Sequence, residues 1–196
     1  GLNYKIQDIH NEQGLTNEYI YFYNKKNNVI KEEYVMNKGF ENEGNIRINH
    51  KLTYKNNRLI KDRSKETSWT IKYSNFDKLD NPQVIESISK NKQTKKNIKY
   101  DDKGNILKLT EITYNNGTKV IKKTEFTSYK YDQYNNVIEL LRSSVPKMEY
   151  PIKMIGGPHL YENEFYKYEY NKDGLWTKKV CIINGNESYI WKREYK

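Results

Sequence analysis

The chain has 196 residues, and its 35 basic and 25 acidic side chains give a formal net charge of +10. It contains no alanine, the best helix former, but 19 tyrosines, which favours β-strands over helices. Aromatic residues at alternate positions exclude a purely disordered chain. No apolar run reaches the 18 residues of a membrane-spanning helix, so we expect no transmembrane segment.

From residue 21 onward a short phrase recurs: alternating aromatic residues, Asp or Asn, turn-forming residues, Asn and then aliphatic residues. Clear copies cover 21–31, 98–108, 129–139 and 168–178, and looser copies begin at Leu52 and Ile71. Alternation places the aromatic side chains on one face of a strand, and Asp followed three residues later by Gly or Asn is typical of a tight turn. Each copy therefore predicts a β-hairpin. Six copies with their return turns predict roughly 12 antiparallel up-and-down strands, extended or curled into a half-barrel.

The repeat predicts that the tyrosine ending each outgoing strand occupies an equivalent position and packs beside its counterpart. These residues are Tyr23, Tyr54, Tyr73, Tyr100, Tyr131 and Tyr170. Near the end of the chain, Asn184-Gly185-Asn186 predicts a further hairpin. Because the hairpins follow one another almost without interruption, we expect a single β domain over residues 1–196.

One insertion, 143–165, breaks the repeat, because it carries three of the four prolines and the pair Gly156-Gly157. Proline removes ladder hydrogen-bond donors, so an irregular segment is predicted there. Two interpretations stay open. Its amphipathic residues Tyr150, His159 and Tyr161 are candidate binding residues. Alternatively, the segment plugs an open end of the sheet with its apolar side chains, namely Met148, Ile152, Met154 and Ile155.

Pairs such as Tyr100-Asp101 with Gly104-Asn105, and Tyr131-Asp132 with Asn135-Asn136, resemble the YD repeat of Rhs-like bacterial surface proteins. The run from Trp176 to Lys179 is also similar to small, uncharacterised exported YD-like proteins of Bacteroidetes-type bacteria. The resemblance covers most of 19–180 and implies an extended antiparallel sheet. It supplies no catalytic residue.

The sequence contains no recognisable catalytic, cofactor or metal motif. The three histidines lack metal-ligand spacing, and no nucleophile elbow or phosphate-binding loop is present. Cys181 is the only cysteine, and its apolar neighbours predict a buried strand thiol. The basic residues are scattered along the strands, so the charge of +10 does not favour a nucleic-acid partner. We therefore expect no catalytic residues, no metal and no cofactor.

Three hypotheses for the function follow. The first is a non-enzymatic exported or cell-envelope module that binds a protein or glycan through the sheet face or the 143–165 segment. The second is a carrier of a small apolar or carbohydrate ligand on a tyrosine-lined concave sheet. The third is a hydrolase with a cleft joining His159 to Glu162 or Glu164. The chain opens at Gly1 and not at Met, which predicts a removed export leader and a periplasmic, outer-membrane-surface or secreted protein.

Overall fold

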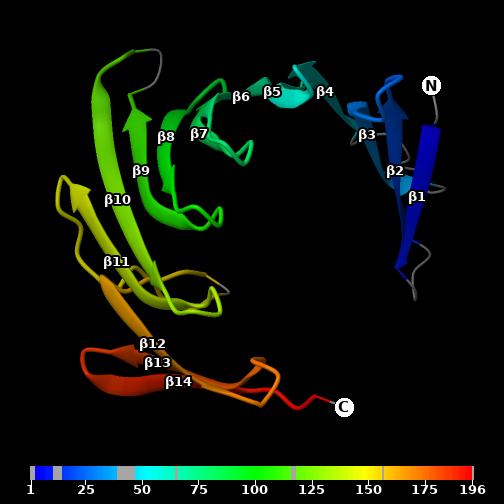
Figure 1. Ribbon diagram of the computed structural model, residues 1–196. Helices are drawn as coiled ribbons and strands as arrows, with labels where there is room; N and C mark the ends of the chain where they lie inside the picture. Colours follow the sequence, from blue (N-terminus) through cyan, green and yellow to red (C-terminus); the bar gives the residue numbers. More distant parts are fainter. Residues whose placement is uncertain are drawn as a thin grey trace. The chain divides into compact units, whose positions relative to one another are not determined.

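The computed structural model describes residues 3–10, 15–38, 47–64, 66–115, 118–155 and 157–195, and every regular element in these residues is a β-strand. The prediction of an all-β antiparallel fold is confirmed (Figure 1). The strands are β1 (Asn3–His10), β2 (Leu15–Tyr23), β3 (Val29–Lys38), β4 (Arg47–Lys55), β5 (Arg58–Ser64), β6 (Trp69–Phe76), β7 (Pro82–Ile88), β8 (Gln93–Tyr100), β9 (Ile106–Tyr114), β10 (Ile121–Tyr131), β11 (Val137–Val145), β12 (Asn163–Tyr170), β13 (Trp176–Ile183) and β14 (Asn186–Lys192).

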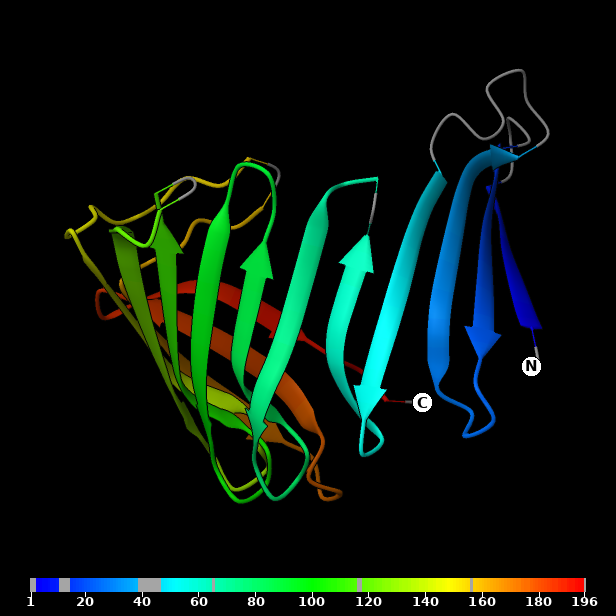
Figure 2. The same ribbon diagram turned by 90° about the horizontal axis from the view of Figure 1, so that it is seen from above.

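The strand order in the sheet is the order in the sequence, from β1 to β14. Figure 2 shows the hairpins that join successive strands. The roughly 12 strands predicted from the six repeat copies correspond to β2–β13. The structure adds β1 before the repeats, and the Asn184-Gly185 turn leads into β14.

Five of the repeated turns share one geometry, illustrated by Asp101, whereas the turn between β4 and β5 has two consecutive residues of positive φ, Asn56 and Asn57. The carboxylate oxygen Oδ1 of Asp101 accepts hydrogen bonds from the backbone N–H groups of Lys103 (2.9 Å) and Asn105 (2.8 Å). Gly104 then takes a positive φ of 87°, which L-residues other than Asn and Asp rarely adopt. The same pattern starts at Asn24, Asp77, Asp132 and Asn171. The side-chain acceptor explains why the repeat requires Asp or Asn at this position.

One predicted equivalence is wrong. Tyr23, Tyr131 and Tyr170 directly precede the residue that opens the turn, but Tyr73 does not. In that hairpin Phe76 precedes Asp77, and it lies opposite Pro82 as Tyr131 lies opposite Val137. The repeat pattern predicts the wrong end for this strand, because β6 continues for three residues beyond Tyr73.

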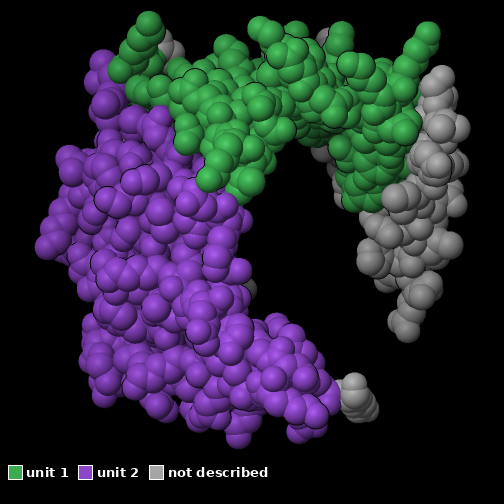
Figure 3. Space-filling model, in the orientation of Figure 1, with its two compact units in different colours: residues 1–95, 114–119 green, residues 96–113, 120–196 purple. Residues whose placement is uncertain are grey.

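The chain divides into two compact units (Figure 3). Unit 1 comprises 1–95 and 114–119, and unit 2 comprises 96–113 and 120–196. Among the described residues, the buried hydrophobic side chains are Val180, Cys181 and Ile183, all on β13. Tyrosines and other half-buried side chains therefore supply much of the packing. A single domain over 1–196 stays a prediction.

The irregular segment is shorter than predicted, since 143–145 belong to β11 and 163–165 to β12. Between these strands, Ile152 and Leu160 form an isolated antiparallel bridge with hydrogen bonds of 2.8 and 3.0 Å. Gly156 lies outside the described residues. Met154 and Ile155 are exposed, so these two side chains do not act as a plug, while Met148 and Ile152 are half-buried.

Candidate binding site

One face of unit 2 gathers aromatic side chains from three strands, β10, β12 and β14. Residues directly opposite each other in a sheet share a face. Tyr129 of β10 lies opposite Leu140 of β11, and Leu140 lies opposite Glu164 of β12. Further along, Tyr166 lies opposite Cys181, and Cys181 lies opposite Tyr189. We call this surface the tyrosine face; its large aromatic side chains are Tyr129, Tyr131, Tyr166, Tyr168, Tyr170, Tyr189 and Trp191.

Several of these rings are fixed by hydrogen bonds from their hydroxyl groups. The Tyr131 hydroxyl donates to the carbonyl of Ile106 (2.9 Å), and the Tyr168 hydroxyl donates to the carbonyl of Val137 (3.1 Å). The Tyr170 hydroxyl donates to the carboxylate of Asp132. Burial raises the pKa of Tyr168 to about 12 and also raises the pKa of Tyr170. The rings are therefore neutral and held in place near neutral pH.

A buried ion pair lies beside these rings. The Arg142 guanidinium contacts the carboxylate of Glu164, which is only 9% exposed. Arg142 Nη1 also donates to the carbonyl of Tyr161 (2.6 Å). The Tyr166 hydroxyl donates to the second carboxylate oxygen of Glu164. Burial, followed by this hydrogen bond, raises the pKa of Tyr166. Both carboxylate oxygens are thus satisfied, as a buried carboxylate requires.

Lys179 lies among three aromatic rings on the same face. Its ammonium is 4.4 Å from the ring centre of Tyr166, 5.0 Å from that of Trp191 and 5.9 Å from that of Tyr168. Burial lowers the pKa of Lys179, while the ring faces favour its charged form. The neighbouring Cys181 is buried, as predicted, and burial raises the pKa of its thiol. A protonated, buried thiol is a poor nucleophile, so this arrangement favours binding over covalent chemistry.

The three residues predicted to bind a partner occupy different environments. The backbone carbonyl of Tyr161 accepts a hydrogen bond from the Arg142 guanidinium. The hydroxyl group of Tyr161 is hydrogen-bonded to Tyr189, and this bond raises the pKa of Tyr161. Tyr150 is half-buried, and burial raises its pKa. His159 is exposed. Of the three, Tyr161 is the one that the structure connects to the tyrosine face.

The cleft expected for a hydrolase would bring His159 to a carboxylate. Within 157–195 and the other described residues, no hydrogen bond or ion pair joins His159 to Glu162 or Glu164. Glu164 is instead bound to Arg142 and Tyr166.

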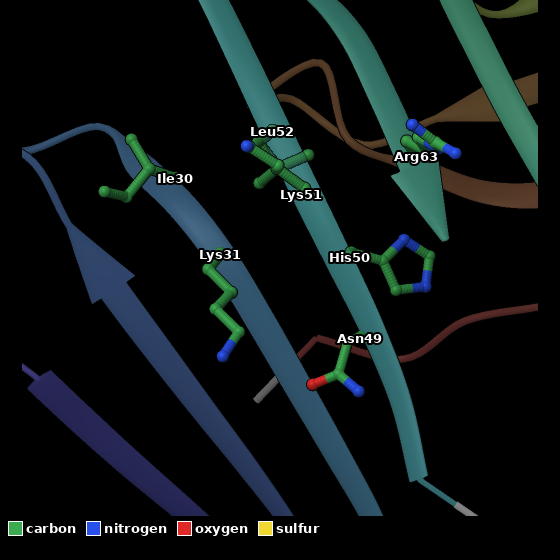
Figure 4. Close-up of a pocket in the computed structure, with 7 residues that line it drawn as sticks. All are labelled: Ile30, Lys31, Asn49, His50, Lys51, Leu52 and Arg63. Carbon is green, nitrogen blue, oxygen red and sulfur yellow. The ribbon is translucent and has the colours of Figure 1, made fainter. Parts of the chain in front are cut away.

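Unit 1 contains a groove of about 530 Å³ on β3, β4 and β5, lined by Ile30, Lys31, Asn49, His50, Lys51, Leu52 and Arg63 (Figure 4). His50 Nδ1 lies 3.0 Å from the carboxylate of Asp62, and its ring packs edge-on against Trp69. Ser64 lies opposite His50 but is 1% exposed, and its hydroxyl donates to Glu66 (3.3 Å). Ser64 and His50 therefore do not form an accessible nucleophile–base pair.

Sequence reasoning missed the contact between Arg142 and Glu164. The two residues are 22 positions apart in the sequence. The irregular segment between β11 and β12 is long, so the sequence does not specify which residues of the two strands lie opposite each other. The period-two alternation of the sequence does predict part of this arrangement, because it places Glu164, Tyr166 and Tyr168 on one face of a strand.

No family model and no curated protein matches the chain. Among solved structures, a porin-like protein from Bacteroides uniformis ATCC 8492 aligns over 96% of this chain and 94% of its own, at 11% sequence identity and a TM-score of 0.38. A TM-score this low assigns neither a function nor a location.

No helix in the described residues is long and apolar enough to cross a membrane. The same residues contain no group of three or more His, Cys, Asp or Glu side chains placed to hold a metal ion.

Proposed function

We propose that the chain is an exported cell-envelope protein that acts as a binding module and takes a protein partner on the tyrosine face of unit 2. The observation that carries this proposal is a set of half-buried aromatic rings, held by hydroxyl hydrogen bonds, on a sheet face with few buried hydrophobic residues.

The composition of the face supports a protein partner. Tyr, Trp and Arg are enriched where protein interfaces bury most area, and they dominate binding energies there. The face also offers a half-buried cation, Lys179, among its rings. A partner with aromatic or carboxylate groups would complement these side chains.

The fixed rings favour tight recognition. Ordering a side chain on binding costs about 0.5–1.5 kcal/mol, and this cost is reduced when the side chain is already held in place. The hydrogen bonds of Tyr131 and Tyr168 to backbone carbonyls of the preceding hairpin hold these two rings in place in the free protein.

The cell-envelope location follows from the resemblance to YD-repeat surface proteins. Fractionation of cells carrying a tagged full chain tests it directly. We expect the tag in the envelope or the medium, and a tag confined to the cytosol would contradict this location.

Binding is tested with the solubilised envelope fraction of the source organism and immobilised protein in an optical biosensor. We expect the double variant Tyr129→Ser/Tyr168→Ser to lose binding. The matched control Lys130→Ser/Lys167→Ser, on the opposite face, should keep it. Protease treatment of the fraction should abolish the signal. Binding that survives protease but is lost after periodate oxidation would assign a glycan instead, and no binding above background would overturn the proposal.

The groove in unit 1 favours a second candidate, a carrier of a small ligand. Its volume of about 530 Å³ lies in the range of small-molecule sites, and Ile30 and Leu52 give it apolar walls. Because Trp69 packs against His50, which lines the groove, a ligand bound in the groove should change the fluorescence of Trp69. Titration with apolar probes into a variant that keeps Trp69 but has Trp176 and Trp191 replaced by Phe tests this, and an unchanged signal at probe saturation would contradict it.

A further inference from the structure

The last strand of the sheet, β14, has features of an interface strand. It pairs with β13, and among the described residues no strand pairs with its other edge. All seven of its residues are exposed. Three of them are large and apolar: Tyr189, Ile190 and Trp191 are 39%, 53% and 43% exposed. Free edges in soluble proteins are usually protected by charge, proline or a bulge, because open backbone groups invite pairing with another strand.

The register shows which backbone groups of β14 are open. Arg193 N–H donates to the carbonyl of Thr177 on β13 (2.9 Å), so the backbone of Arg193 faces β13. Hydrogen-bonded and non-hydrogen-bonded pairs alternate along an antiparallel ladder. The backbone groups of Trp191 and Tyr189 therefore also face β13, and those of Ile190 and Lys192 point to the open edge.

We propose that β14 pairs antiparallel with β14 of a second copy of this chain, with the two-fold axis at Ile190. In this register Ile190 lies opposite Ile190 of the second copy, and Ser188 lies opposite Lys192. The Ile190 pair uses open backbone groups and allows about two hydrogen bonds across the interface, and Ser188, which lies at the register shift of β14, forms the irregular end of the contact. Tyr189 lies opposite Trp191 in a non-hydrogen-bonded pair, where side chains approach most closely.

Other two-fold registers fit the strand less well. An axis at Lys192 places two lysines opposite each other, which is unfavourable. An axis at Trp191 places Ile190 opposite Lys192 and requires Arg193, which already packs over its own Trp176 ring at 3.8 Å. An axis at Tyr189 centres the contact next to Ser188, which lies at the register shift, whereas an axis at Ile190 meets this residue only at the end of the contact. The axis at Ile190 spans residues 188–192 and opposes no like charges.

The proposed pairing has a consequence for the binding surface. A two-fold axis perpendicular to the sheet keeps the same face on the same side, so Tyr189 and Trp191 of both copies form one aromatic cluster. The tyrosine face of one copy then continues locally into that of the other. This inference does not depend on the proposed partner.

Register-specific cross-linking tests the proposal in the full chain with Cys181→Ser. Two single variants are prepared, Tyr189→Cys and Trp191→Cys, and are oxidised separately and as an equal mixture. Non-hydrogen-bonded pairs suit disulfide geometry, so the mixture should form cross-linked dimer several times faster than either variant alone. Faster self-cross-linking of Trp191→Cys or of Tyr189→Cys would overturn the axis at Ile190.

Sedimentation equilibrium supplies the second measurement. The unmodified chain should form a dimer that dissociates on dilution, because a single pair of strand edges buries little area. Ile190→Lys opposes two lysines at the axis and should raise the dissociation constant by about tenfold or more. Phe165→Lys, at an exposed site two strands away, should leave it unchanged. A monomeric unmodified chain, or equal loss in both variants, would overturn the proposal.

Discussion

The two units differ in which charges their strands place opposite each other. Two cross-strand pairs in unit 2 have opposite signs, although Lys178 also lies opposite Lys192. Lys130 lies opposite Glu139, and their side chains meet at 2.9 Å. Lys178 lies opposite Glu169, and their side chains meet at 2.8 Å. At these two positions the adjacent strands of unit 2 are matched by their side chains as well as by their backbones.

Unit 1 contains a row of like charges, although Lys72 also lies opposite Glu86. Lys31 of β3 lies opposite Lys51 of β4, and Lys51 lies opposite Arg63 of β5. Nearby, Lys61 lies opposite Lys72. Like charges directly opposite each other are destabilising, so this row weakens the pairing of β3, β4 and β5. Hairpins built from one repeat can therefore differ in how much their cross-strand side-chain pairs contribute to the stability of the fold.

The largest expected effect is at the buried ion pair of unit 2. Arg142→Leu leaves the Glu164 carboxylate buried without its cation and should lower the free energy of unfolding by about 3–5 kcal/mol. Chemical denaturation followed by tryptophan fluorescence can assign the loss, because Trp176 and Trp191 lie in unit 2 and Trp69 in unit 1.

A matched pair of variants separates the ion pair from simple packing. Arg142→Leu/Glu164→Leu removes both charges and should recover much of the loss. If the single variant unfolds within about 0.5 kcal/mol of the parent, as surface substitutions do, the pair is not a stabilising element of unit 2.

A smaller effect is expected in the turns of unit 2. Gly174 has a φ of +75°, and an added Cβ would lie 2.9 Å from Tyr134 Cε1. Gly174→Ala should cost about 1–2 kcal/mol for the left-handed backbone and about 0.5–1.5 kcal/mol for the disturbed contact between Tyr134 and Tyr170. Gly185, with φ of +81° and open space, is the control. Thermal unfolding showing equal losses for Gly174→Ala and Gly185→Ala would contradict the contribution of Tyr134.

Much of the fold could be predicted from the sequence because its signals are local. The Asp101 turn, for example, depends on one side chain and a glycine three residues later. The candidate site could not be predicted in the same way, because Arg142 meets Glu164 through a register that no local pattern specifies. Tyr73 shows the limit within the repeats, since an extension of β6 moved the turn away from it.

The tyrosine hydroxyls give unit 2 a pH dependence. Tyr168→Phe removes the bond to the Val137 carbonyl and should cost about 1 kcal/mol near neutral pH. Burial raises the pKa of Tyr168 in the folded chain to about 12, above its ordinary value of about 10. The neutral hydroxyl therefore stabilises the fold below about pH 10, and this stability is lost as the pH rises through about 12. Unfolding free energies measured across this window should converge for parent and variant, and a constant difference would contradict the assignment.

The smallest expected effect tests the charge row of unit 1. Lys51→Glu places a carboxylate between Lys31 and Arg63, so both cross-strand pairs then have opposite signs. Opposite-charge cross-strand pairs are worth about 0.2–1 kcal/mol relative to neutral ones, so the Trp69-reported free energy of unfolding should rise by about 0.5 kcal/mol or more. Because Lys51 and Arg63 are exposed, the gain should shrink at about 1 M salt, where charges are screened within about 3 Å. The mirror variant Glu139→Lys in unit 2 should show a salt-dependent loss reported by Trp176 and Trp191. A gain in unit 1 that salt leaves unchanged would show that Lys51 acts through packing of its long side chain, and the electrostatic contrast between the units would then be wrong.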